Sequence, residues 1–283
     1  MFVSRRPRLG LSVAVVVVTA VAALCGVLAP KAQAFYIFNH ERITRDALTP
    51  VGVDNTAMLQ IFVGPPPGAG VVGSDAFFSD EFRHIDDARN PADICARTQQ
   101  AWNFFIPIVL SGALPTGPGG SDLVDGPSAR AAFGGLAHAL QDFYSHTDWV
   151  EDNIAVGQLE RMPPPLMPNC DPAALPPGLH SGFFSLDLGG SHEDRLAGCP
   201  PSGPPPGYAE CHSTLNKDAW DTSRGIVQIA GTNPPINNFD LAARLATRAT
   251  TDLYWQVRGL VVGNAGECVA NNLFQADRHE PCL

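Results

Sequence analysis

Apolar residues recur every three or four positions over several long stretches of the chain, whereas the strict alternation typical of half-buried strands is scarce. This spacing places the apolar side chains of each stretch on one face of a helix. The predicted helices span residues 39–48, 90–110, 127–153, 216–229 and 239–262. The pattern therefore predicts an all-α fold with long irregular connections.

Several residues at the ends of these stretches are suited to begin or interrupt a helix. Asn39 can cap the first predicted helix, and Asp125 can cap the helix that begins at Pro127, because proline is tolerated in a first turn. Pro107 marks a kink or the approaching end of the second helix. Two stretches rich in Gly and Pro are predicted to be loops, at residues 64–73 and 114–126.

The start of the chain has the features of an export signal. A basic beginning with three arginines precedes the apolar run 9–28, and Ala32-Gln33-Ala34 follows as a cleavage sequence. The apolar run is also long enough for a membrane anchor, but the cleavage sequence directly after it favours removal. Residues 1–34 are therefore predicted to be a signal peptide for general or twin-arginine export, with Phe35 as the mature N-terminus of a secreted protein.

The formal charge limits the class of partner. The predicted signal holds four basic residues, Arg5, Arg6, Arg8 and Lys31, and no acidic one, so its removal changes the formal charge from −10 to −14. Such an acidic, exported chain is a poor electrostatic partner for long nucleic acid. Bound divalent cations would reverse this charge locally, and some of the acidic residues are candidate ligands.

Six cysteines follow the predicted signal, and an even number in an exported chain predicts three disulfides with 15 pairings to choose from. None lies in a C-x2-C pair, which disfavours a thiolate zinc site. Three of them, Cys170, Cys199 and Cys211, lie in or next to the Pro/Gly-rich insertion 161–210. That composition is compatible with disorder, but the cysteines and several apolar residues favour an ordered, disulfide-stapled region.

The stretch HALQDFYSHTDWVE, residues 138–151, carries the most informative chemistry. His138, Asp142 and His146 are spaced by four, so on a helix they lie on one face over two turns. Two imidazoles and a carboxylate in this register form half of a divalent metal site. A hydrogen-bonded His–Asp pair on a helix surface is the simpler explanation for one such spacing. Three residues in register favour the metal.

Two other segments combine histidine with carboxylates. SDAFFSDEFRHIDDARNP contains Asp75, Asp80 and His84, followed by two further aspartates, and would otherwise be interpreted as a solvated loop. ECHSTLNKDAW contains His212 and Asp218, and would otherwise be a disulfide-flanked surface loop. Histidine close to carboxylates in three separate segments suggests ligands that the fold brings together.

Taken with these motifs, the chain resembles the zinc-dependent phospholipase C and single-strand nuclease superfamily, and within it the heterokaryon-incompatibility (Het-C) branch. The run HALQDFYSHTDWVE carries the specific similarity, and RHIDD resembles the family's His-Phe-Asp stretch. The resemblance covers most of the chain after the signal, except the Pro-rich region. It implies a multi-helix, all-α domain over residues 35–283 with a trinuclear zinc site. In that site the amine and carbonyl of the mature N-terminal residue are ligands.

The resemblance implies a full set of site residues. The implied metal ligands are Phe35, His40, Asp75, His84, His138, Asp142, His146, His212 and Asp218. His40 would be the sixth mature residue, which agrees with cleavage after Ala34. Asp80 is an alternative to Asp75, and His192 is an alternative to His212. The implied catalytic residues are Asp75, which would orient water or act as general base, and Asp142, which would bridge or ligate metal.

The chain departs from the family pattern at three places. Phe35 replaces the usual N-terminal Trp, and His146 follows Asp142 after four residues where other branches use six. Asn216 stands where the last carboxylate is expected, four residues after His212, so Asp218 would have to substitute. A metal-stabilised or catalytically degenerate interaction domain is therefore one alternative function.

The expected function is a secreted phosphoester hydrolase of the phospholipase C type. Two or three Zn²⁺ ions would activate water against a small phosphoester or phospholipid, and the protein would contact a membrane surface. A single-strand nuclease is a second alternative, because such an enzyme needs aromatic stacking sites. Trp102, Tyr144 and Trp149 are the candidates, although core packing is the simpler role for Trp149.

Overall fold

The computed structural model describes residues 36–77, 80–117, 120–185, 199–278 and 280–282. The predicted signal peptide, Phe35 and His192 lie outside these residues. The helices are α2 (Tyr36–Leu48), α3 (Asn55–Val63), α4 (Gly70–Asp75), α5 (Glu81–His84), α6 (Pro91–Gly112), α7 (Gly126–His146), α8 (Trp149–Ala155), the 3-10 helix η1 (Pro172–Ala174), α9 (His212–Leu215), α10 (Asn238–Ala265) and α11 (Glu267–Phe274). Within the described residues, extended pairing is limited to isolated bridges, so the predicted all-α fold is confirmed.

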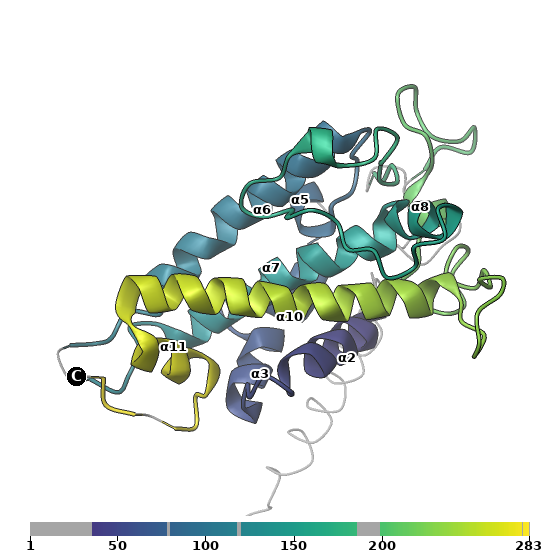
Figure 1. Ribbon diagram of the computed structural model, residues 1–283. Helices are drawn as coiled ribbons and strands as arrows, with labels where there is room; N and C mark the ends of the chain where they lie inside the picture. Colours follow the sequence, from purple (N-terminus) through teal and green to yellow (C-terminus); the bar gives the residue numbers. More distant parts are fainter. Residues whose placement is uncertain (1–35, 78–79, 118–119, 186–198, 279, 283) are drawn as a thin grey trace, which may run out of the picture. The chain divides into compact units, whose positions relative to one another are not determined.

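Helix α7 lies at the centre of the described fold. It packs against α3, α4, α6 and α10, and Figure 1 shows it between α6 and the long α10. Small residues allow this close packing: a Cβ added at Gly134 would lie 2.0 Å from the backbone oxygen of Ile61, and one at Gly135 would lie 2.4 Å from the ring of Phe105. Almost every residue of α7 is buried. Polar side chains on this helix therefore face protein rather than water.

The prediction of one helix over residues 127–153 is wrong, because the chain forms two helices there, α7 and α8, with a break after His146. The chain is extended at Thr147 (φ −104°, ψ 165°), which pairs with Ser181. The hydroxyl of Thr147 donates back to the carbonyl of Phe143 at 2.5 Å. The local pattern continues through this break, but pairing with a distant segment ends α7 and lets α8 begin at Trp149.

The predicted helix 216–229 is wrong. Most of this stretch forms turns, and only α9 (His212–Leu215) precedes it. The side-chain oxygen of Asn216 accepts the N–H of Asp218 at 2.8 Å, and the hydroxyl of Thr222 donates to the carbonyl of Asn216 at 2.9 Å. These local side-chain bonds compete with a helix, as is typical of Asn and Thr.

Other boundaries also differ from the sequence pattern. The predicted loop 64–73 is wrong in its last residues, because α4 begins at Gly70. Helix α3 was not predicted, although Asp54 caps it by accepting the N–H of Ala57 at 2.8 Å. Helix α6 continues through Pro107 to Gly112.

The described cysteines form three disulfides, as the sequence predicts. The pairs are Cys95–Cys170, Cys199–Cys211 and Cys268–Cys282. Disulfides of this number are typical of extracellular proteins. The described part of the insertion is ordered, with Leu166, Leu175 and Leu179 buried in the core.

Among the described residues, none of the helices combines the length and the apolar character that a membrane crossing requires.

Candidate metal centre

Histidine and aspartate side chains from four separate segments meet those of α7. They form four groups, and in each group the candidate ligand atoms lie within 4.8 Å of one another. The groups are His40–His138–Asp142, Asp75–His84–His138, Asp86–His146–His212 and Asp142–His146–Asp218. Because His138, Asp142 and His146 each belong to two groups, the four groups form one continuous, buried centre.

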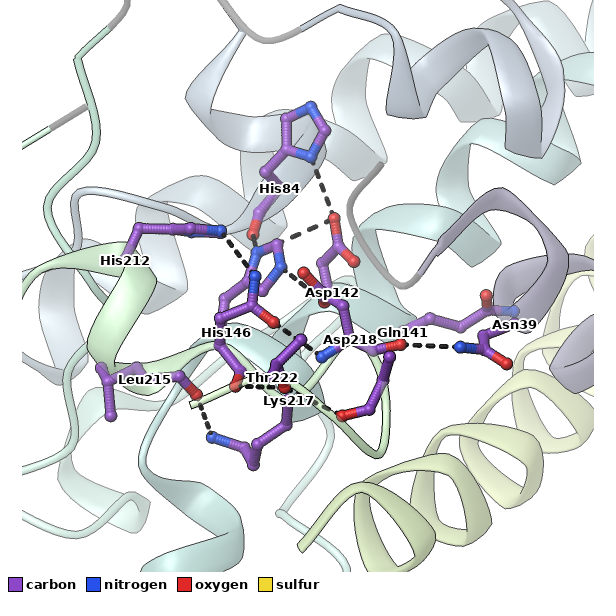
Figure 2. Close-up of polar contacts among 12 residues, drawn as sticks. Asn39, His84, Gln141, Asp142, His146, His212, Leu215, Lys217, Asp218 and Thr222 are labelled. Carbon is purple, nitrogen blue, oxygen red and sulfur yellow. Dashed lines mark hydrogen bonds and ion pairs between the residues drawn. The ribbon is translucent and has the colours of Figure 1, made fainter. Parts of the chain in front are cut away.

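Asp142 lies at the middle of this centre. Its Oδ1 is 3.1 Å from Nε2 of His40, which α2 supplies, and its Oδ2 is 3.0 Å from Nδ1 of His84, which α5 supplies. Figure 2 shows Asp142 with His84 on one side and His146 close by. The helix register predicted from the sequence thus places one carboxylate within reach of ligands from two other helices.

Asp75 ends α4 and reaches the same centre. Its Oδ1 lies 3.5 Å from Nε2 of His138, and it forms a group with His138 and His84. The alternative residue, Asp80, instead pairs with Arg83 at 2.9 Å, and its side chain is 34% exposed. Of these two aspartates the geometry brings Asp75, and not Asp80, into a group with histidines.

The segment after α9 supplies the last side chains. Nε2 of His146 lies 3.0 Å from Oδ1 of Asp218, which forms a group with Asp142 and His146. Asn216 itself is buried, with its amide nitrogen 3.4 Å from Nε2 of His212. Its side-chain oxygen fixes the backbone of Asp218. Asn216 therefore helps to place the carboxylate of Asp218.

Asp86 belongs to the centre although the sequence did not single it out as a ligand. Its Oδ1 lies 3.0 Å from Nδ1 of His212 and 3.4 Å from Nδ1 of His146. Its neighbours Ile85 and Asp87 both have positive φ angles, of 52° and 58°. The signals in the sequence were its position two residues after His84 and the resemblance of RHIDD to the family's His-Phe-Asp stretch.

Fixed acceptors orient several of the imidazoles. Nδ1 of His138 lies 3.0 Å from the carbonyl oxygen of Arg83, and Nδ1 of His146 lies 3.1 Å from that of His84. Nδ1 of His40 lies 2.6 Å from Oε1 of Gln141. Since a carbonyl oxygen can only accept, Nδ1 carries a proton in each ring, and Nε2 is the nitrogen that faces a carboxylate of the centre. Metal-binding histidines are commonly fixed in this way.

Burial and charge act against each other throughout the centre. Burial alone would raise the pKa of Asp142, but His138, His146 and His40 hold that pKa well below its usual range. Burial lowers the pKa of His138 well below its ordinary value, against the attraction of Asp142. Burial also acts to lower the pKa of His146, but Asp142 and Asp218 outweigh it and raise that pKa well above normal. The same interactions lower the pKa of Asp86 and Asp218, so these two carboxylates and Asp142 remain ionised inside the protein.

The donor set fits divalent metal ions. Among the described residues, the ion pairs of Asp86, Asp142 and Asp218 all lead to imidazoles rather than to Lys or Arg. Oδ2 of Asp218 is buried and accepts no hydrogen bond within that part of the chain. Buried carboxylates need a compensating cation, and imidazole nitrogen with carboxylate oxygen is a ligand set that zinc accepts. These groups can thus hold metal ions.

The aromatic residues considered for base stacking are not available at the surface. Trp149 and Tyr144 are buried in the core, and Trp102 is 9% exposed. The indole of Trp149 donates to the carbonyl of Arg161 at 3.2 Å. This burial agrees with the simpler packing role expected for Trp149, and it removes these three residues as stacking sites.

Comparison with known proteins adds no neighbour: no family model matches the chain, and no curated protein or solved structure matches it.

Proposed function

We propose that this chain is a zinc-dependent phosphoester hydrolase of the phospholipase C type, secreted after removal of residues 1–34. The proposal places it in the zinc-dependent phospholipase C and single-strand nuclease superfamily, in the Het-C branch. The observation that carries it is the continuity of the four buried His/Asp groups through His138, Asp142 and His146. A hydrolase that acts through several ions needs adjacent metal sites, and Asp142, which belongs to two of the groups, is the candidate for a carboxylate shared between them.

The proposal assigns the side chains to three neighbouring positions. His40 and Asp142 would hold one ion together with the amine and carbonyl of Phe35. Asp75, His84 and His138 would hold a second. His146, His212 and Asp218 would hold a third.

The roles of the chain's own groups follow from their placement. Asp142 and Asp218 remain ionised and supply negative charge. His40, His138 and His146 present Nε2 from rings whose Nδ1 is already bound. Asp75 would accept a proton from, or orient, the attacking water. When bound, Zn²⁺ would supply an acidified water and a Lewis acid for the phosphoryl oxygens. The substrate would be a small phosphoester or the headgroup of a phospholipid.

Two measurements on the mature, secreted protein test this function. Plasma mass spectrometry should find two or three zinc ions per chain, and hydrolysis of a short-chain lecithin should cease on chelation and return with Zn²⁺. Asp142→Asn should abolish both properties. Asp93→Asn is a matched control, because that carboxylate pairs with Arg89 on the surface. Activity that persists in chelator would exclude the mechanism.

The same protein also tests the alternatives. Bound zinc without hydrolysis of lecithin or single-stranded DNA would indicate a metal-stabilised interaction domain. Cleavage of DNA alone would indicate a nuclease, which the burial of Trp102, Tyr144 and Trp149 disfavours.

A further inference from the structure

One short segment, Arg83–Asp87, provides hydrogen-bond acceptors to imidazoles from two other parts of the chain. The carbonyl of Arg83 faces Nδ1 of His138, and the carbonyl of His84 faces Nδ1 of His146. The carboxylate of Asp86 faces Nδ1 of His212. These three hydrogen bonds make the segment a support for the rings rather than a simple connection.

The backbone of this segment is held in an uncommon conformation. Ile85 has a φ of 52° and Asp87 a φ of 58°, in the left-handed region that residues other than glycine seldom adopt. For a β-branched residue such as Ile85 this conformation is strained, and such strain gathers at functional sites. Between these two residues, the N–H of Asp86 donates to the carbonyl of Glu81 at 3.2 Å, which fixes the position of its side chain.

Asp86 could either bind the ion directly or orient the imidazoles that bind it, and its contacts distinguish these two roles. As a direct ligand, Asp86 would share an ion with the ring nitrogens that it faces, which are the Nδ1 atoms of His146 and His212. Nδ1 of His146 is already committed to the carbonyl of His84 at 3.1 Å. Nε2 of His146 faces Asp218 instead. The ion position therefore lies on the Nε2 side, away from Asp86.

The surroundings of His212 lead to the same assignment. Asp86 can only accept at Nδ1, whereas the amide nitrogen of Asn216 can donate toward Nε2 at 3.4 Å. Both contacts select the ring form with the proton on Nδ1. The lone pair of Nε2 is then left to accept, and an ion bound there would take the place of the Asn216 amide. Asp86 is 2% exposed, and within the described chain its ion pairs lead to His146 and His212 alone.

We propose that Asp86 is a positioning residue: it accepts the Nδ1–H of His212, supports His146, and so directs both Nε2 atoms toward the ion held with Asp218. The proposal rests on the metal site of the proposed function and adds to it a residue that does not touch the ion. A carboxylate in this role fixes the ring and increases the basicity of the coordinating nitrogen.

The test compares Asp86→Ala and Asp86→Asn with the wild type. Asn keeps an acceptor for the Nδ1–H but lacks the charge. Asp87→Asn is the matched control, since Asn tolerates a positive φ and can still accept the N–H of Phe184. Zinc affinity at each position is measured by competition with a chelator, and nitrogen NMR of the metal-free protein reports which nitrogen of His212 carries the proton.

Asp86→Ala should weaken one zinc position by about 10–100-fold and leave the others occupied, with a smaller loss in Asp86→Asn and none in Asp87→Asn. Metal-free wild type should show His212 protonated at Nδ1. Unchanged zinc affinity in both Asp86 variants would overturn the proposal, as would a proton on Nε2 of wild-type His212. If Asp86→Ala does not fold, the zinc affinity of Asp86→Asn and the NMR spectrum of the wild type still test the proposal. If wild type binds no zinc, the proposed function fails, and the spectrum alone decides whether Asp86 orients His212.

Discussion

The ammonium group of Lys217 lies 2.8 Å from the carbonyl oxygen of Thr147, and the lysine side chain has no exposed surface. The same ammonium donates to the carbonyl of Leu215 at 2.9 Å and pairs with Glu151 at 3.3 Å. Lys217 directly precedes Asp218, and Thr147 directly follows His146. The hydrogen bond between Lys217 and Thr147 therefore holds these two segments together. The contact of His146 with Asp218 thus depends on a buried cation outside the His/Asp groups.

Replacing this lysine should lower both stability and metal affinity. Lys217→Met leaves two buried carbonyls and Glu151 without their donor, and we expect a loss of about 2–3 kcal/mol in the free energy of unfolding. Urea denaturation measures it. Arg244→Met is the control, because the Arg244–Glu160 pair is exposed and such pairs contribute about 0–1 kcal/mol. Equal losses in the two variants would contradict the structural role of Lys217.

Asn216→Ala should weaken zinc binding beside Asp218. The substitution removes the acceptor for the N–H of Asp218, a hydrogen bond worth about 1 kcal/mol, which corresponds to roughly a fivefold loss of affinity. Competition with a chelator measures it. Asn103→Ala, at an exposed position of α6 where the amide oxygen accepts from Gln99, is a matched surface control. Wild-type affinity in Asn216→Ala would show that Asp218 is held by other contacts.

Metal removal should destabilise the folded protein. The buried carboxylates repel one another once compensating cations leave, and ligand binding at 1,000 times its Kd stabilises the folded state by about 4 kcal/mol. Calorimetry with and without chelator should show a lower Tm that Zn²⁺ restores and Mg²⁺ does not, since imidazole favours zinc. The Tm of Asp142→Asn should respond much less to chelator. A Tm that is indifferent to chelator in the wild type would oppose a metal centre.

The Cys199–Cys211 disulfide should matter for metal binding more than another disulfide of similar span. Cys211 directly precedes His212, whereas Cys268–Cys282 joins α11 to the C-terminal tail. The two disulfides have similar sequence separations, 12 for Cys199–Cys211 and 14 for Cys268–Cys282. Replacing either pair by serine should cost about 3 kcal/mol of stability by the loop-entropy relation. Only the Cys199/Cys211 double variant should lose zinc at His212. Equal zinc content in both double variants would contradict this prediction.

Stability should fall at alkaline pH through His180. A hydrogen bond from its Nδ1 to Asp148, 3.1 Å away, is the main cause that raises the pKa of His180 to about 9, against partial burial. Because the folded pKa exceeds the ordinary value of 6.5, the contribution is complete below about pH 6.5 and is lost as the pH rises through 9. Allowing for solvent screening, it amounts to about 1 kcal/mol.

Urea midpoints at pH 6 and pH 10 measure this contribution. His180→Gln should be less stable than the wild type at pH 6 and nearly equal to it at pH 10. A constant difference between the two proteins across this range would assign the effect to packing rather than to charge.

Local sequence determined much of the helical framework. The aspartate predicted to cap α7, Asp125, accepts the N–H of Ser128 at 3.2 Å, and the four-residue spacing places His138, Asp142 and His146 on the buried face that meets the other histidines. These features depend on hydrogen bonds and side-chain positions within one or two turns of a helix. The spacing of residues in the chain is therefore sufficient to predict them.

Tertiary structure decided how the separate segments complete the centre. The contacts His84–Asp142, His146–Asp218 and Asp86–His212 join residues 58, 72 and 126 positions apart. Other long-range contacts decided that Asp75 rather than Asp80 faces His138, and that α7 ends where Thr147 pairs with Ser181. A short-range pattern contains no information on such contacts, because they form only when distant segments pack on α7 and bury their polar groups together.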